Sequence, residues 1–140
     1  LKGKMSFQAG GTLKPIRAIG LYANETFEVP SFLMDTTEVS RVEFKSIFPE
    51  FHGDQQSPNG SIVEVSFRHA LAYAEAVGKQ IPTAWDLTWA ATNGNQTKYP
   101  WGEAVTDMDW PEQHTVGDFV DQNQATPPIF GLFSGPLEWA

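Results

Sequence analysis

Residues Ser66–Ala91, SFRHALAYAEAVGKQIPTAWDLTWAA, carry the clearest structural signal in the chain. Apolar side chains recur at three- and four-residue steps after Ser66, whose hydroxyl suits the N-cap of an amphipathic helix. Gly78 suits the left-handed residue that ends such a helix. Thr83 and Asp86 form a capping box that opens a second helix. The stretch therefore predicts two short helices, joined by a tight turn and packed on a common core.

The residues before this stretch predict short strands and one further helix. Met5–Thr12 predicts a strand that runs into a glycine turn, and Glu25–Asp35 predicts β-structure in which Pro30 indicates an edge or a break. Ser40 begins another capping box, which predicts a helix that stops near Pro49. Ile62–Val65 predicts a further brief strand. After the second helix of the opening stretch, turn residues and scattered aromatics predict long irregular loops.

The composition indicates one acidic domain. The chain has 140 residues, of which 41% are hydrophobic, and this is enough for a core. Its formal net charge is −8 and it has no basic run, which argues against a nucleic-acid partner. The sequence contains no cysteine, so disulfides, thiolate catalysis and zinc–cysteine sites are excluded from these residues. No stretch approaches the roughly 20 apolar residues of a membrane-spanning helix.

A set of short motifs follows in order along nearly the whole chain. They are Phe32–Ser40 (FLMDTTEVS), Val65–Ser66, Gly78–Thr83 (GKQIPT), Trp89–Ala91 (WAA), Tyr99–Gly102 (YPWG), Gly131–Phe133 (GLF) and Glu138–Trp139. This order resembles the formylglycine-generating enzyme, or sulfatase-modifying factor, family. The resemblance implies an α+β, C-type-lectin-like formylglycine-generating-enzyme fold. We expect a single domain over residues 1–140, which could be the N-terminal part of such a domain, with few strands, two to three short helices and long loops.

The resemblance also implies chemistry for which ligands are missing here. Enzymes of the family oxidise a cysteine of a sulfatase with a copper-bound pair of cysteines that follow the Glu-Trp stretch, and this chain has no cysteine. In the family, an asparagine ahead of Glu-Trp helps to hold calcium, whereas Ser134–Pro136 is shortened here and leaves Glu138 of that pattern. Calcium takes about six to eight oxygen ligands, so one carboxylate is a poor site. We therefore expect no bound cofactor, with Glu138 as the one weak metal ligand.

A late acidic loop is the candidate ligand-binding site. It contains Trp110, the tryptophan most expected to be exposed, together with Asp107, Asp109, Glu112 and Asp118. The loop could bind a cation or a basic partner. The alternative interpretation is a solvated acidic face, which is what such runs usually are.

The remaining aromatic and histidine side chains favour structural roles. Trp85, Trp89, Trp101 and Trp139 could form a sugar-stacking surface, but buried tryptophans more often form the core of a small aromatic domain. The histidines His52, His69 and His114 are far apart and lack the spacing of a structural metal site. His69 falls at the third position of its predicted helix, which indicates a local change in capping.

Three functions remain open from the sequence. The first is a pseudoenzyme: a non-catalytic, extracytoplasmic (periplasmic or secreted) binding or regulatory module that recognises a protein or glycan partner through the late loops. The second is the N-terminal fragment of a sulfatase-modifying-type oxidase whose catalytic half is missing. The third is a sugar-binding, lectin-like domain. None of the three requires nucleic acid or a membrane span, and the sequence leaves the oligomeric state open.

Overall fold

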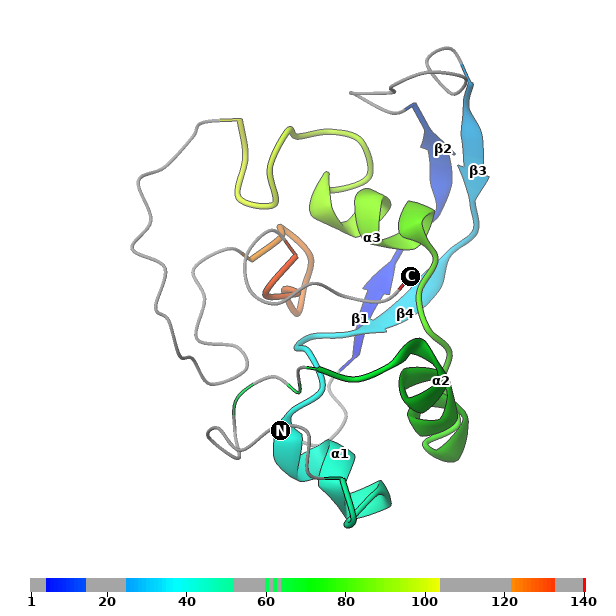
Figure 1. The fold of residues 1–140 in the computed structure, drawn as a ribbon. Helices are drawn as coiled ribbons and strands as arrows, with labels where there is room; N and C mark the ends of the chain where they lie inside the picture. The colour runs from blue at the N-terminus through cyan, green and yellow to red at the C-terminus, as the bar shows by residue number, and fades with distance from the viewer. Residues whose placement is uncertain are drawn as a thin grey trace.

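A computed structural model describes residues 5–14, 25–51, 60, 62, 64–103, 122–132 and 140. Within these ranges the chain forms four short strands and three helices (Figure 1). The strands are β1 (Met5–Gln8), β2 (Gly11–Leu13), β3 (Phe27–Val29) and β4 (Phe32–Asp35). The helices are α1 (Arg41–Ile47), α2 (Phe67–Ala76) and α3 (Ala84–Ala91). The predicted α+β class with few strands and two to three short helices is confirmed.

The strands form two antiparallel ribbons, in which β1 pairs with β4 and β2 pairs with β3. The ribbons are separated where Gly10 faces Pro30, so of the two roles that the sequence left open for Pro30, an edge or a break, the structure shows the break. A Cβ at Gly10 would overlap the Val29 carbonyl, so only glycine fits this close backbone approach. The Gly10 N–H donates to Ser31 Oγ at 2.9 Å, and this bond keeps the two segments of the chain together between the ribbons.

Each helix begins at the cap that its sequence predicts. Ser40 Oγ accepts from the Glu43 N–H at 3.3 Å, and the Glu43 carboxylate accepts from the Ser40 N–H at 2.9 Å. Thr83 and Asp86 make the same reciprocal pair at α3, with distances of 3.1 and 2.8 Å. These bonds satisfy N–H groups that the first helical turn leaves without partners. The local sequence is therefore sufficient to set where these helices start.

Helix α2 has a modified cap at its start and a glycine-based cap at its end. Ser66 Oγ accepts from the His69 N–H at 3.2 Å and lies 2.8 Å from His69 Nδ1, so the imidazole contacts the capping hydroxyl and the reciprocal bond of a capping box is not made. At the other end Gly78 has φ +71°, and the Lys79 N–H donates to the Ala74 carbonyl at 2.8 Å. This is the Schellman arrangement. It favours glycine at the position of Gly78, because the residue there must adopt a positive φ. Both predictions for the ends of α2 are confirmed.

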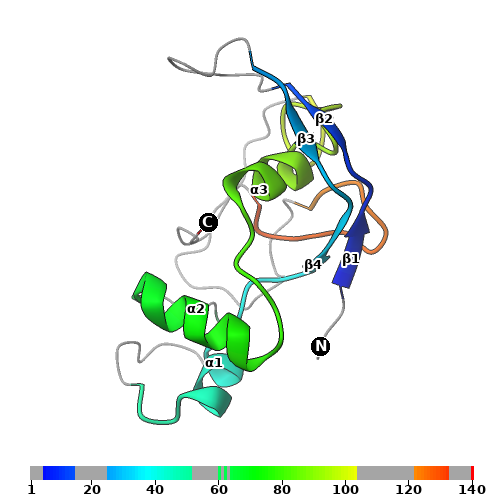
Figure 2. The ribbon, with the colours of Figure 1, turned by 90° about the vertical axis from the view of Figure 1, so that its right-hand side faces the viewer.

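The core lies between α3 and the β2–β3 ribbon, where the two are seen side by side in Figure 2. Leu13, Val29 and Trp89 form its buried centre, and Trp89 Nε1 donates to the Ala9 carbonyl at 2.8 Å. Trp85 packs against this cluster. The prediction that these two tryptophans belong to the core is confirmed, as expected for large rings whose N–H groups need partners.

A second aromatic cluster joins α1 to α2 at the opposite end of the molecule from β2–β3 (Figure 2). The Phe44 ring stacks on Tyr73 with centroids 5.3 Å apart and meets Phe51 edge-on at 5.1 Å. The described chain thus has two packed regions, joined through β4 and the turn between α2 and α3.

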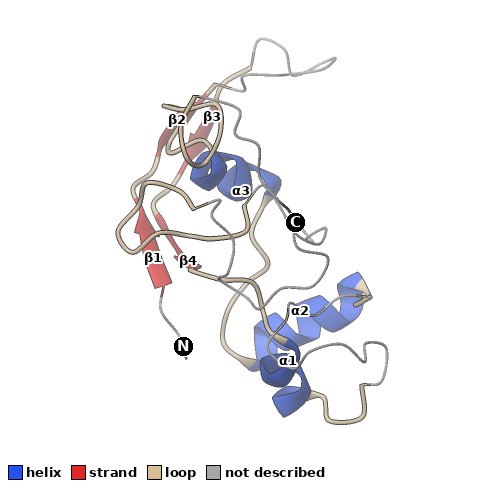
Figure 3. Ribbon diagram, turned by 90° about the vertical axis from the view of Figure 1, so that its left-hand side faces the viewer, coloured by secondary structure: helices blue, strands red, loops and turns tan. Residues whose placement is uncertain are grey.

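Loops make up much of the described chain, as Figure 3 shows and as the sequence predicted. The brief strand predicted at Ile62–Val65 is wrong, because Ile62, Glu64 and Val65 are not in a strand. Glu64 has φ +58°, which interrupts an extended run, and the Ile62 N–H donates to the Val39 carbonyl at 2.9 Å. No helix in the described ranges is long and apolar enough to cross a membrane.

Candidate functional site

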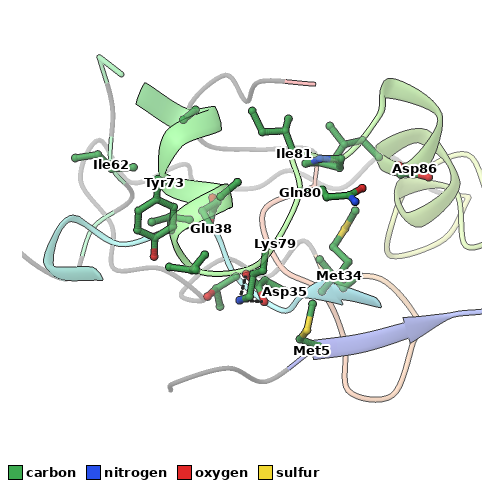
Figure 4. Close-up of a pocket in the computed structure, with 18 of the residues that line it drawn as sticks. Met5, Met34, Asp35, Glu38, Ile62, Tyr73, Lys79, Gln80, Ile81 and Asp86 are labelled. Carbon is green, nitrogen blue, oxygen red and sulfur yellow. Dashed lines mark hydrogen bonds and ion pairs between the residues drawn. The ribbon is translucent and has the colours of Figure 1, made fainter. Parts of the chain in front are cut away.

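A large pocket lies between β4, α2 and the turn that leads into α3 (Figure 4). Its volume is about 1080 Å³. Apolar side chains form most of its wall, among them Met34, Ala70, Ala74, Ile81 and Ile129. Pockets with an apolar wall and a few placed polar groups are the usual form of a binding site. This pocket is therefore the candidate functional site within the described residues.

The Schellman turn after α2 positions the polar edge of the pocket. Because Gly78 reverses the chain, Lys79 faces the end of β4, where its Nζ lies 2.7 Å from both Asp35 oxygens (Figure 4). The two side chains are 35% and 33% exposed, so water screens the ion pair and its contribution to stability is small. Its main effect is to tie the α2–α3 turn to β4 at the edge of the pocket.

A buried asparagine holds another wall of the pocket in place. Asn123 is 4% exposed, and its Oδ1 accepts from the Ile129 N–H at 2.8 Å. Its Nδ2 donates to the Ala90 carbonyl at the end of α3, at 3.2 Å. Buried backbone N–H and C=O groups need hydrogen-bond partners, and in irregular chain a side-chain amide can supply the partners that a helix or sheet would otherwise provide. Asn123 thereby sets the position of Ile129, which lines the pocket.

The same segment, residues 122–132, is also attached to the β1–β4 ribbon, beside which it lies in Figures 1 and 2. Ser6 is fully buried and its hydroxyl donates to the Pro127 carbonyl at 2.6 Å. The Phe130 N–H donates to the Thr36 carbonyl, just after β4, at 2.9 Å. The segment therefore forms a fixed wall between the ribbon and α3.

Gly131, the first residue of the GLF motif, leaves space for a carboxylate that lines the pocket. It has φ +77°, and a Cβ at this position would lie 2.5 Å from Glu38 Oε1. A side chain would therefore be strained by both the backbone angle and the contact. The glycine of this motif makes room for Glu38, which lines the pocket.

Tyr73 is a pocket residue with an altered ionisation. Burial raises the pKa of its hydroxyl above the usual value of 10.0, and the negative charges of Glu43 and Asp35 raise it further. Tyr73 therefore presents a neutral hydroxyl, which can donate a hydrogen bond, over the whole physiological pH range.

The predicted site residues Asp107, Asp109, Trp110, Glu112, Asp118 and Glu138 lie outside the described residues, as do His52, His114 and Trp139. Their roles stay predictions. Trp101 is half-buried and stacks in parallel on Tyr99, with ring centroids 5.2 Å apart. Sequence reasoning missed the pocket and Asn123, because neither carries a local signal.

The described residues contain no group of three or more histidine, cysteine, aspartate or glutamate side chains able to hold a metal ion. The copper site that the resemblance implies needs thiolate ligands, and the whole 140-residue sequence has no cysteine. A thiolate copper site therefore does not fit these residues.

Comparison with known proteins agrees with the order of the motifs. The sulfatase-modifying factor enzyme 1-like domain matches residues 2–134. A stretch of 50 residues is 44% identical to the formylglycine-generating enzyme of Thermomonospora curvata, and it covers 35% of this chain but 16% of that enzyme. The chain therefore spans much less than two thirds of this relative. The extent of the domain match shows that the chain belongs to the FGE-sulfatase family.

Proposed function

We propose that these 140 residues act as a non-catalytic binding module on a formylglycine-generating-enzyme scaffold, with a polypeptide segment held in the β4–α2 pocket. The observation that carries the proposal is the pocket itself, about 1080 Å³ with a mainly apolar wall. Two family motifs shape it, since the turn at Gly78 forms one edge and Gly131 makes room for Glu38 in its wall.

The character of the wall favours a polypeptide over a glycan. A sugar needs a dense set of hydrogen-bond donors and acceptors, whereas this wall is mostly aliphatic and methionine side chains. On β4, Leu33 lines the pocket and remains 60% exposed. An amphipathic segment lying in an apolar groove would cover surface of this kind.

The charge around the pocket favours basic residues in the partner. The acids that line it are Asp35, Glu38, Glu64 and Asp86, while Lys79 is the one base among the described lining residues. Complementary charge raises the association rate and selects against acidic partners. The expected partner segment therefore combines large apolar side chains with lysine or arginine.

A second candidate function follows from the match to the Thermomonospora curvata enzyme. In this case the chain is the scaffold part of a sulfatase-modifying-type oxidase, and the pocket receives the remainder of the enzyme. The thiolates would then come from outside these 140 residues, since none lies within them.

A peptide selection with pocket variants tests the first proposal. A random peptide library is selected on the 140-residue chain, and each recovered peptide is titrated against Ala70→Trp and Ala76→Trp. Ala70 lines the pocket, whereas Ala76 is exposed on the same helix and does not. We expect apolar, basic peptides whose affinity falls at least about ten-fold in Ala70→Trp and stays unchanged in Ala76→Trp. Peptides that bind both variants equally well contradict the proposal.

A cysteine-oxidation assay separates the two candidates. The chain is incubated with copper and a cysteine-containing peptide, alone and together with the part of the Thermomonospora curvata enzyme that lies outside the matched stretch. No oxidation is expected from the chain alone, and oxidation by it overturns both candidates. Oxidation that needs both polypeptides favours the scaffold of an oxidase, and none in either mixture favours the binding module.

A further inference from the structure

A left-handed turn directly after α3 contains an Asn-Gly pair. Asn93, Gly94 and Asn95 have φ values of 50°, 68° and 65°. Asn-Gly pairs deamidate spontaneously more readily than other asparagine sequences, because glycine has no side chain to hinder attack by its backbone nitrogen on the asparagine amide carbon. The turn therefore contains a chemically reactive dipeptide inside an ordered part of the fold.

The fold restrains both reacting groups of this pair. Asn93 Nδ2 donates to Thr97 Oγ1 at 2.6 Å and to the Pro100 carbonyl at 2.8 Å, and its Oδ1 accepts from the Gln124 N–H at 2.6 Å. The attacking nitrogen is held as well, since the Gly94 N–H donates to the Trp89 carbonyl at 2.9 Å. Both groups must leave their partners before they can react.

We propose that Asn93 is a deamidation site which the folded structure keeps closed, and that its modification releases the pocket wall at residues 122–132. In the reaction the Gly94 nitrogen loses its proton to solvent and bonds to Asn93 Cγ. The C–N bond of the side-chain amide breaks, its NH2 group takes up a proton from solvent, and ammonia leaves with a succinimide in place. Water then opens the ring to aspartate or isoaspartate. The sum is one water consumed and one ammonia released, without any change of oxidation state.

The product keeps an oxygen that can accept from the Gln124 N–H, but it loses both donor contacts of Asn93 Nδ2. A carboxylate has no N–H to donate to Thr97 or to the Pro100 carbonyl, and it repels that carbonyl oxygen. The isoaspartate form also lengthens the main chain within the turn. Repulsion from the Pro100 carbonyl and the loss of both donors displace the new carboxylate, so its hold on the Gln124 N–H, next to the buried anchor Asn123, is weakened. This inference does not depend on what binds in the pocket.

The first test follows deamidation by peptide mapping of the full chain at mildly alkaline pH, in buffer and in concentrated urea. Asn59-Gly60, the other Asn-Gly pair in the sequence, is the internal comparator. In urea we expect equal rates at Asn59 and Asn93. In buffer we expect Asn93 to react at least about ten-fold more slowly than in urea, since reaction requires local opening. Equal rates at Asn93 in the two solvents overturn the proposal.

Variants test the restraint and its consequence separately. Thr97→Val removes one acceptor, so Asn93 should deamidate several-fold faster in buffer and at an unchanged rate in urea. Asn93→Asp mimics the product and should speed amide hydrogen exchange at Gln124 and Ile129, which Asn59→Asp should leave unchanged. An unchanged buffer rate in Thr97→Val, or unchanged exchange in Asn93→Asp, contradicts the proposal.

Discussion

Replacing Gly11 by alanine tests how tightly the core is packed. A Cβ at this position would lie 2.8 Å from Trp89 Cη2 and 3.1 Å from Cζ2, closer than side chains normally approach. The Trp89 ring is 7% exposed and is anchored by its bond to the Ala9 carbonyl, so it cannot move aside freely. Overpacking of this kind costs about 1–3 kcal/mol. Alanine also restricts the unfolded chain more than glycine does, which offsets about 0.4–1 kcal/mol of that cost.

We therefore expect Gly11→Ala to lower the free energy of unfolding by about 1–2 kcal/mol, measured by urea titration with an unchanged m-value. A Trp89→Phe background supplies the control, because the smaller ring lacks the atoms that the new methyl group meets. In that background Gly11→Ala should be neutral or slightly stabilising, which gives a coupling of at least about 1 kcal/mol between the two sites. An equal change in the free energy of unfolding in both backgrounds would refute the predicted clash between the new methyl group and the Trp89 ring.

Three further predictions concern the walls and the edge of the pocket. Asn123→Ala should lower the free energy of unfolding by about 2–4 kcal/mol, because it leaves the buried Ile129 N–H without its partner and removes the bond from Asn123 to the Ala90 carbonyl. An effect below about 1 kcal/mol in urea titrations contradicts this. Because the folded-state pKa of Tyr73 lies above its usual value of 10.0, the stability that this causes is fully present below about pH 10 and is lost as pH rises through the folded-state pKa. Thermal melts of Tyr73→Phe from pH 8 to 11 should therefore show a smaller alkaline loss than the parent protein, and equal losses refute this assignment. A double-mutant cycle with Lys79→Gln and Asp35→Asn should give a coupling below about 1 kcal/mol that falls in 1 M salt, whereas a large coupling that resists salt contradicts a solvent-screened pair.

Predictions from sequence succeeded where a feature is decided within a few residues. The N-caps at Ser40, Ser66 and Thr83 each act on a partner three residues ahead, so their effect is readable from the sequence alone. The break at Pro30 and the left-handed Gly78 follow equally from the covalent geometry of those residues. The family resemblance succeeded for a related reason, since several such local signals occur in a fixed order.

The pocket could not be predicted, because it depends on pairings between distant residues. Asn123 holds the Ala90 carbonyl 33 positions earlier in the chain, and nothing near Asn123 in the sequence separates it from an ordinary loop residue. The strand predicted at Ile62–Val65 was wrong for a similar reason. Its β-branched residues favour extended backbone, but Glu64 takes a positive φ in the folded chain, and propensity is only a weak constraint against tertiary packing.

The most direct test of a binding module with its site in the β4–α2 pocket is a methyl NMR titration of the chain with a selected peptide. We expect shifts at the pocket methyls of Met34, Ala70 and Ile129, with the methyls of Leu13 and Val29 in the β2–β3 core unchanged. Shifts confined to methyl groups outside the pocket, with Met34, Ala70 and Ile129 unmoved at saturation, would contradict it.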